Sequence, residues 1–128
     1  MTQLQKFIYE QENGFKTTKE LLEDLRDFRV DWDGKGSSPI SENLYNRCLK
    51  LVENLYLEPV IILENSNKIF FEYTNELYET LRFKIKKDKI FVIKLGRDKG
   101  EDYLCEIGNT NLDEICSVMN TFISEFLD

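Results

Sequence analysis

Apolar residues in the first half of the chain recur every three or four positions, which is the spacing of amphipathic helices. A first helix is expected over about residues 18–29, with a stripe formed by Leu21, Leu22, Leu25 and Phe28. A second helix is expected over about residues 41–56, with a stripe formed by Leu44, Cys48, Leu51, Val52 and Leu55. Residues 1–16 are compatible with a short helix or a strand, followed by a turn at Asn13 and Gly14.

Polar residues mark the starts of these helices. Thr17 and Glu20 have the spacing of a capping box, in which each side chain binds the backbone N–H of the other residue. Ser41 is the expected N-cap of the second helix, and Asn111 is that of a final helix near the end of the sequence. The final helix has a nearly continuous apolar face, which needs a sheet to cover it.

From residue 60 the apolar period changes to two, which is typical of strands. Strands are expected at 60–63, 68–73, 81–86, 90–95 and 103–107. The third alternates most clearly: Leu81, Phe83 and Ile85 face one side, and Arg82, Lys84 and Lys86 face the other. The order of elements predicts a single α+β domain over residues 1–128. We expect an antiparallel β-meander of about five strands, with two N-terminal helices and one C-terminal helix packed on one face and the basic face in solvent.

Composition narrows the class of protein. Apolar residues make up 41% of the chain, and no apolar run approaches the length of a membrane span. The first residues lack the apolar segment of a signal peptide, and Cys48, Cys105 and Cys116 form no Cys-x-x-Cys pair. We therefore expect a cytoplasmic protein with free thiols and no membrane contact.

The chain contains no histidine. This removes the commonest general base, the usual nucleophile triads and most zinc sites, but it leaves carboxylate and magnesium chemistry open. We expect a protein that is not an enzyme and that carries no cofactor.

Charge is distributed unevenly along the chain. Residues 82–99 hold eight basic and two acidic residues, a balance of +6, which leaves −13 for the remainder of a chain whose net charge is −7. The acidic majority argues against nucleic-acid binding and suits a basic partner surface. The basic strand face is in turn a candidate docking surface for an acidic partner, or for the acidic helices of a second copy.

Residues 31–42, D-W-D-G-K-G-S-S-P-I-S-E, match part of the EF-hand calcium pattern. Asp31, Asp33 and Glu42 fall at its first, third and twelfth positions. Against this, Lys35 stands where an oxygen ligand belongs, and Pro39 stiffens the segment that should wrap the ion. A calcium-binding module or a metal-dependent carboxylate enzyme built on these three acids stays an alternative.

Two other interpretations of the same stretch are a phosphate loop and a structural corner. The phosphate pattern fails because Gly36 follows Lys35 where a P-loop has Ser or Thr, and because no strand precedes it. In the structural interpretation, Trp32 fills the gap between the first two helices and the sheet, and Asp33-Gly34 makes a tight turn. The exposed side of such a corner remains a candidate recognition surface.

Two motifs resemble a bacterial and phage family that reads W-D-G-x-G-A-x-P-I-S and then I-x-F-E-Y/W. The first is matched by Trp32, Asp33, Gly34, Gly36, Pro39, Ile40 and Ser41, with Ser37 in place of the alanine. The second is matched by Ile69, Phe71, Glu72 and Tyr73. The resemblance implies a small, soluble protein of a kind often found on mobile elements, and it supplies no catalytic residues.

Glu72 lies among apolar neighbours and, by alternation, on the basic face of the sheet. We expect it to face Arg82 or Lys84 across the strands. A carboxylate site shared with Asp31 and Asp33 is the alternative.

The charge separation, the absence of histidine and the resemblance together predict a small acidic protein-binding module. The first hypothesis is a phage or mobile-element protein that inhibits a host defence protein by stoichiometric binding. An antitoxin or immunity protein that binds a cognate protein is an alternative, and a homodimer is a further candidate assembly. The candidate contact surface comprises Trp32, Asp33, Lys35, Arg82, Lys84 and Lys86.

Overall fold

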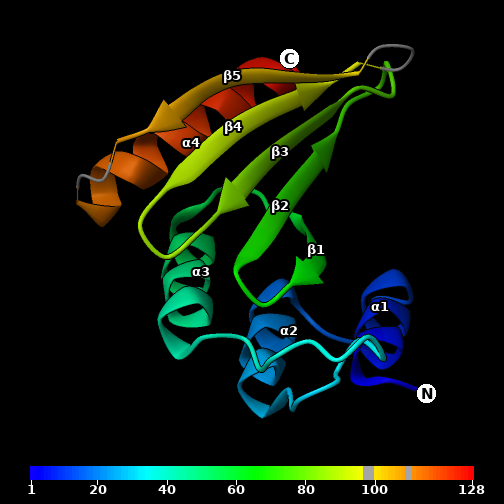
Figure 1. Ribbon diagram of the computed structural model, residues 1–128. Helices are drawn as coiled ribbons and strands as arrows, with labels where there is room; N and C mark the ends of the chain where they lie inside the picture. Colours follow the sequence, from blue (N-terminus) through cyan, green and yellow to red (C-terminus); the bar gives the residue numbers. More distant parts are fainter. Residues whose placement is uncertain (97–99, 109–110) are drawn as a thin grey trace.

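The computed structural model describes residues 1–96, 100–108 and 111–128 and shows the expected α+β fold (Figure 1). The helices are α1 (Gln3–Glu12), α2 (Thr18–Asp24) with a 3-10 turn at Leu25–Asp27, α3 (Glu42–Asn54) and α4 (Leu112–Leu127). The strands are β1 (Val60–Asn65), β2 (Lys68–Thr74), β3 (Thr80–Ile85), β4 (Ile90–Leu95) and β5 (Glu101–Ile107). Within the described ranges, no helix is long and apolar enough to cross a membrane.

The five strands form one antiparallel sheet in the order β1-β2-β3-β4-β5, as the meander prediction requires. Phe71 pairs with Phe83, and Phe83 pairs with Val92, so one apolar row crosses the middle of the sheet. All three side chains are fully buried. The two-residue alternation therefore fixes which side of the sheet faces the core.

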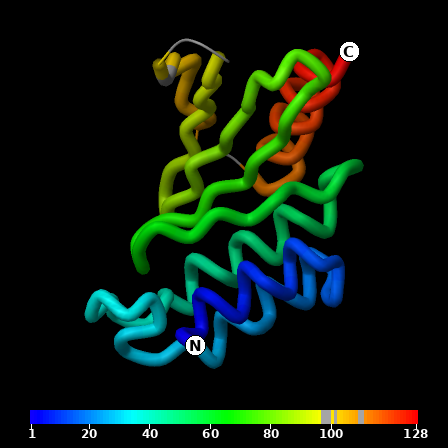
Figure 2. The backbone as a smooth tube through the Cα atoms, turned by 90° about the vertical axis from the view of Figure 1, so that its right-hand side faces the viewer, coloured from blue at the N-terminus to red at the C-terminus, as the bar shows by residue number. Residues whose placement is uncertain are grey.

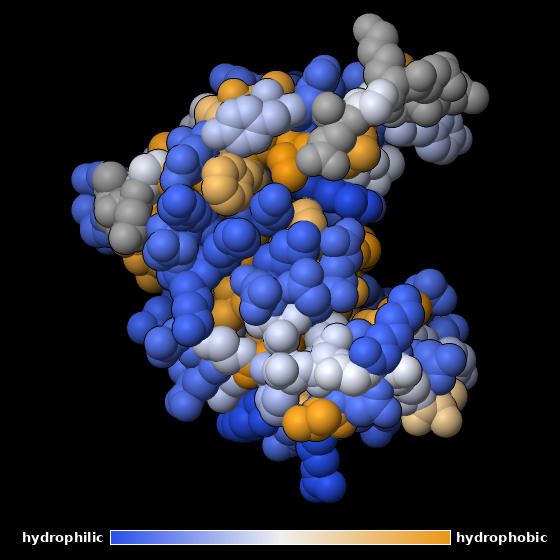
Figure 3. Space-filling model, in the orientation of Figure 1, coloured by the Kyte–Doolittle hydropathy of each residue, from blue (hydrophilic) through white to orange (hydrophobic). Residues whose placement is uncertain are grey.

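The helices cover that apolar side. In Figure 1, α4 lies behind β4 and β5, and Figure 2 shows α1, α2 and α3 together beneath the β1–β2 side of the sheet. One core cluster joins the apolar side of the sheet to all four helices, through residues such as Phe7, Leu22, Leu44 and Met119. The opposite side of the sheet is open, and Figure 3 shows mainly hydrophilic surface on it, with smaller apolar areas between.

A third helix precedes the sheet, where the sequence leaves residues 1–16 open. Thr2 and Gln5 form a capping box that starts α1, and Phe7 is 3% exposed against the core. The helix expected over 18–29 remains α-helical only to Asp24 and continues as the 3-10 turn. Local capping and one buried aromatic residue thus decide a segment that periodicity alone leaves undecided.

The other predicted caps are largely confirmed. Thr17 and Glu20 form a capping box, and the Asn111 side chain accepts from the N–H of Glu114 at 2.9 Å. Ser41 is the N-cap of α3, as predicted, but within the described structure its side chain makes no capping hydrogen bond. Its carbonyl accepts from the N–H groups of Leu44 and Tyr45 instead, each at 3.1 Å.

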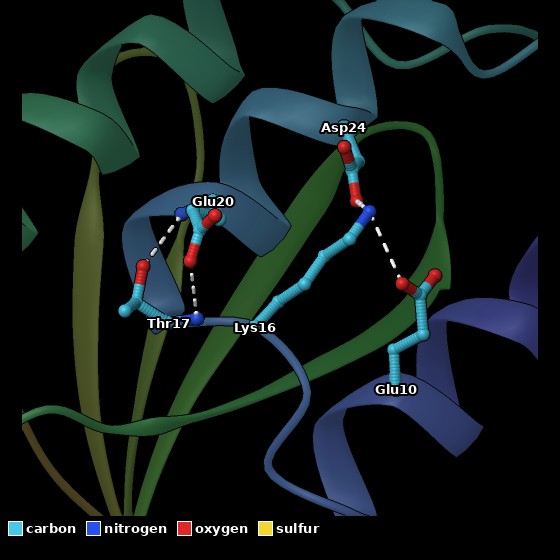
Figure 4. Close-up of polar contacts among 5 residues, drawn as sticks. All are labelled: Glu10, Lys16, Thr17, Glu20 and Asp24. Carbon is cyan, nitrogen blue, oxygen red and sulfur yellow. Dashed lines mark hydrogen bonds and ion pairs between the residues drawn. The ribbon is translucent and has the colours of Figure 1, made fainter.

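Lys16 joins α1 to α2 (Figure 4). Its Nζ lies 2.6 Å from Oδ2 of Asp24 and 3.1 Å from Oε2 of Glu10. The hydrogen bond to Asp24, and then that to Glu10, raise the pKa of Lys16. The position of α1 therefore depends on one cation between two helices as well as on Phe7.

Cys48, Cys105 and Cys116 are free thiols, as predicted. Cys48 and Cys116 are buried, and burial raises the pKa of both. They fill space in the core between α3, α4 and the sheet.

Candidate functional site

The loop between α2 and α3 is closed by its own aspartates. Oδ1 of Asp31 accepts a hydrogen bond from the N–H of Gly36 at 2.6 Å, and Oδ1 of Asp33 accepts from the N–H of Lys35 at 2.9 Å. The Ser37 hydroxyl donates to the other carboxylate oxygen of Asp33 and, as the largest cause, lowers the pKa of Asp33. The loop is therefore held in one shape by contacts within itself.

Positive φ angles show why the loop needs glycine. Gly34 and Gly36 both have φ of 77°, and a side chain at Gly34 would bring its Cβ within 3.3 Å of Cγ2 of Thr2. Asp31 has φ of 68°, which aspartate tolerates better than most residues.

Trp32 anchors the loop to the core. The side chain is 1% exposed, its ring lies 5.4 Å from that of Phe28, and Nε1 donates to the carbonyl oxygen of Ser38 at 2.8 Å. The carbonyl oxygen of Trp32 accepts from the N–H of Leu4 at 3.0 Å, which ties the loop to α1. Trp32 was expected among the contact residues, but its indole is enclosed, and the burial agrees with its alternative role as a structural plug.

The loop aspartates are not arranged as metal ligands. Asp31 and Asp33 accept hydrogen bonds from backbone and hydroxyl donors of the loop itself. Glu42 is the first residue of α3. Across residues 1–96, 100–108 and 111–128, no group of three or more acidic residues or cysteines is placed to hold a metal ion. The geometry thus gives the calcium alternative no support.

The end of this loop, which we call the W-D-G loop, lines a cleft of about 490 Å³ together with the β1–β2 turn and the β3–β4 turn. The lining residues are Ser38, Pro39, Ser41, Leu44, Ser66, Asn67, Lys86, Lys87 and Asp88. The cleft therefore combines the two regions that the sequence singles out, the W-D-G loop and the basic strand.

The cleft wall is fixed from below by Arg47 on α3. Its guanidinium donates to the carbonyl oxygen of Lys86 and reaches that of Lys89 at 3.5 Å, while the N–H of Lys86 bonds the Lys89 carbonyl at 2.8 Å. Burial lowers the pKa of Arg47, which nevertheless stays charged at neutral pH. The cleft is thus lined by two lysines and one aspartate of a braced turn, together with three serines.

The basic face of the sheet differs from the expectation. The Arg82 guanidinium and Lys68 Nζ lie 5.5 and 5.6 Å from the centre of the Phe70 ring, and Lys84 Nζ lies 5.2 Å from that of Phe91. These cations lie along the sheet over aromatic rings instead of extending into solvent, because each aliphatic stem covers apolar surface. Phe70 is consequently 5% exposed although it is on the open side.

Glu72 faces Arg82 across β2 and β3, as predicted, with Nε of Arg82 2.7 Å from Oε2 of Glu72. This pair neutralises one of the candidate contact residues. Of the others, Lys86 lines the cleft, Lys84 covers Phe91, and Lys35 is exposed at the tip of the loop. Arg97 and Lys99, which also belong to the basic stretch 82–99, lie outside the described residues.

Sequence reasoning missed several cleft residues. Ser66 and Asn67 form the β1–β2 turn, and Arg47 lies on a helix far from them in sequence. The run Lys86-Lys87-Asp88-Lys89 was a visible signal, but nothing local shows that it lies next to Ser38.

Comparison with protein-family models, curated proteins and solved structures gives no match. The resemblance of the W-D-G motif to a bacterial and phage family therefore stays a prediction.

Proposed function

We propose that the chain is a protein-binding module that takes up an acidic segment of another protein in the cleft between the W-D-G loop and the β3–β4 turn. The observation that carries this proposal is that Lys86 and Lys87 line one cleft together with three serines and a single carboxylate, that of Asp88. Ammonium and hydroxyl groups are donors, and carboxylates are the acceptors that complement them among protein side chains.

The net charge of the molecule favours the lysine-lined cleft over the rest of the surface as a site for an acidic segment. The chain carries a net charge of −7, so most of its surface repels carboxylates. A local group of lysines then both attracts an acidic segment and orients it. Acidic residues on the helices, such as Glu20, Glu23 and Asp24, make the helical side the less favoured docking surface for an acidic segment.

The loop keeps its shape without a partner, which lowers the entropic cost of binding. Asp31, Asp33 and Trp32 hold the loop through bonds that need no partner, so little ordering is required when one docks. In this role the protein acts by occupying its partner in a one-to-one complex.

The biological setting that we propose is a phage or mobile-element inhibitor of a host protein. An antitoxin or immunity protein is the second candidate, and a toxin gene next to the coding sequence would favour it. Both roles use the same stoichiometric binding and the same cleft.

Titration of the isotope-labelled protein with an oligo-glutamate peptide, followed by NMR, tests the proposal. We expect amide shifts at Ser41, Ser66 and Lys87, and loss of these shifts in the Lys86→Glu/Lys87→Glu variant. The variant Lys6→Glu/Lys50→Glu, which makes the same charge change at exposed sites on α1 and α3, is the matched control and should bind like the wild type. Shifts located elsewhere, or equal losses in both variants, would overturn it.

A further inference from the structure

The outer edge of β1 is paired at one residue by a side chain. β1 is the first strand of the sheet, with β2 on one side only. Nε2 of Gln11 donates to the carbonyl oxygen of Ile61 at 3.0 Å, and Oε1 of Gln11 accepts from the N–H of Ile61 at 2.8 Å. These are the two bonds that a residue of a neighbouring antiparallel strand would make. By the two-residue alternation, the backbone groups of Leu63 face the same way.

An apolar groove of about 520 Å³ runs beside this edge, between α1 and β1. It is lined by Leu4, Phe7, Ile8, Gln11, Glu12, Val60, Ile61, Ile62 and Leu63. Val60 is 48% exposed and Ile8 is 41% exposed, and Tyr9 next to Ile8 is 53% exposed. On the right side of Figure 3 the molecule is hollowed between α1 and the upper end of the sheet.

Apart from the Gln11 side chain of α1, the edge carries little protection against strand pairing. Proteins generally place a lysine, a proline or a bulge on an exposed edge strand. Val60–Leu63 contains neither charge nor proline, and its irregularity in pairing with β2 comes only between Leu63 and Asn65. Among the residues that the structure describes, Gln11 is the side chain that hydrogen-bonds to the outward backbone of this run.

We infer that β1 pairs with β1 of a second copy of this chain, with the second strand replacing the Gln11 amide at the edge. A two-fold axis places like surfaces on each other, and this surface complements itself. In an antiparallel pair, the outward N–H groups of each strand donate to the outward C=O groups of the other strand. In this dimer the uncharged run Val60–Leu63 of one copy lies against the same run of the other. An acidic partner would instead place carboxylates against the apolar side chains of Val60 and Ile62.

The charge of the chain gives this dimer a distinctive response to salt. Two copies of net charge −7 repel each other, and salt screens that repulsion, while apolar burial and strand pairing persist. Dimerisation therefore strengthens with salt. Binding of an acidic segment in the lysine cleft weakens with salt, so the two proposals are distinguishable on the same sample.

Sedimentation velocity over a range of protein concentrations, at about 0.1 M and about 1 M NaCl, tests the inference. We expect a reversible dimer that is more populated at the higher salt. Val60→Lys should weaken it at least about tenfold. The control Leu104→Lys, which changes a residue of 45% exposure on β5 at the opposite edge of the sheet, should leave it unchanged.

A further variant separates edge pairing from other association. Gln11→Ala frees the backbone of Ile61, so it should dimerise at least as strongly as the wild type. Circular dichroism confirms that each variant is folded. A monomer at every concentration and salt, or a dimer lost in Leu104→Lys but kept in Val60→Lys, would overturn the inference. Retained oligo-glutamate binding by Val60→Lys would show that the cleft proposal stands apart from it.

Discussion

The indole Nε1 of Trp32 donates a 2.8 Å hydrogen bond to the carbonyl oxygen of Ser38, a residue that lines the lysine cleft. The bond connects the hydrophobic core directly to the candidate site, because Trp32 itself is 1% exposed. The shape of the cleft therefore depends on a residue that no partner can touch.

Replacing Trp32 with phenylalanine tests this connection. The change removes the hydrogen bond, leaves the Ser38 carbonyl without its donor and opens space beside Phe28. We expect a loss of about 1–3 kcal/mol in the free energy of unfolding, measured by urea denaturation. Amide shifts of Ser38 and Ser41 should change as well. Unchanged shifts in a folded variant would show that the indole does not hold the loop.

Asp33 predicts a contribution to stability that depends on pH. Its pKa is lowered in the folded protein, mainly by the Ser37 hydroxyl, so the ionised form is favoured on folding. This contribution is complete above the pKa of the unfolded chain, about 3.9, and is lost as the pH falls through the lower folded value. Denaturation of wild type and Asp33→Asn from neutral pH to acid should therefore converge below about pH 4. Asp27→Asn, at an exposed aspartate of the 3-10 turn, makes the same charge change outside the loop and is the matched control.

Gln11 predicts a measurable cost for uncovering the β1 edge in the monomer. Gln11→Ala removes both hydrogen bonds to Ile61, which are partly buried. We expect a loss of about 1–2 kcal/mol in the free energy of unfolding at low protein concentration. Glu12→Ala, one position along the same helix, is the control and should change stability by less than about 0.5 kcal/mol. Equal effects of the two substitutions would mean that the amide contacts contribute little.

Calcium should leave the protein unchanged. The Asp31 and Asp33 oxygens already accept bonds from loop donors, and Lys35 follows them in the loop. We expect the same melting temperature with and without about 1 mM Ca²⁺. This concentration is at or above the dissociation constants of weak extracellular calcium modules. A rise in melting temperature that Asp33→Asn abolishes would restore the calcium alternative.

The sheet was predictable because each strand carries its own signal. Alternation in β3 determines that Arg82 and Glu72 share a face, and their ion pair follows from the pairing of β2 with β3. What alternation does not contain is the conformation of long side chains. The cations lie over Phe70 and Phe91 because their aliphatic stems cover apolar surface. That surface exists only after the neighbouring strands have paired.

The cleft was predictable only in parts. Both the W-D-G loop and the lysine run are visible in the sequence, but their contact depends on where three connections end in space. Ser38, Ser66 and Lys86 come from different turns, and no periodicity links them. The burial of Trp32 likewise depends on α1, the segment for which local sequence leaves both helix and strand open.

The most direct measurement for the central claim is the affinity of the protein for an oligo-glutamate peptide by calorimetry at low and high salt. The account predicts binding that weakens as salt is raised, disappears in Lys86→Glu/Lys87→Glu and persists in Lys6→Glu/Lys50→Glu. Binding of the same strength in the cleft variant, or no binding by the wild type at low salt, would contradict it.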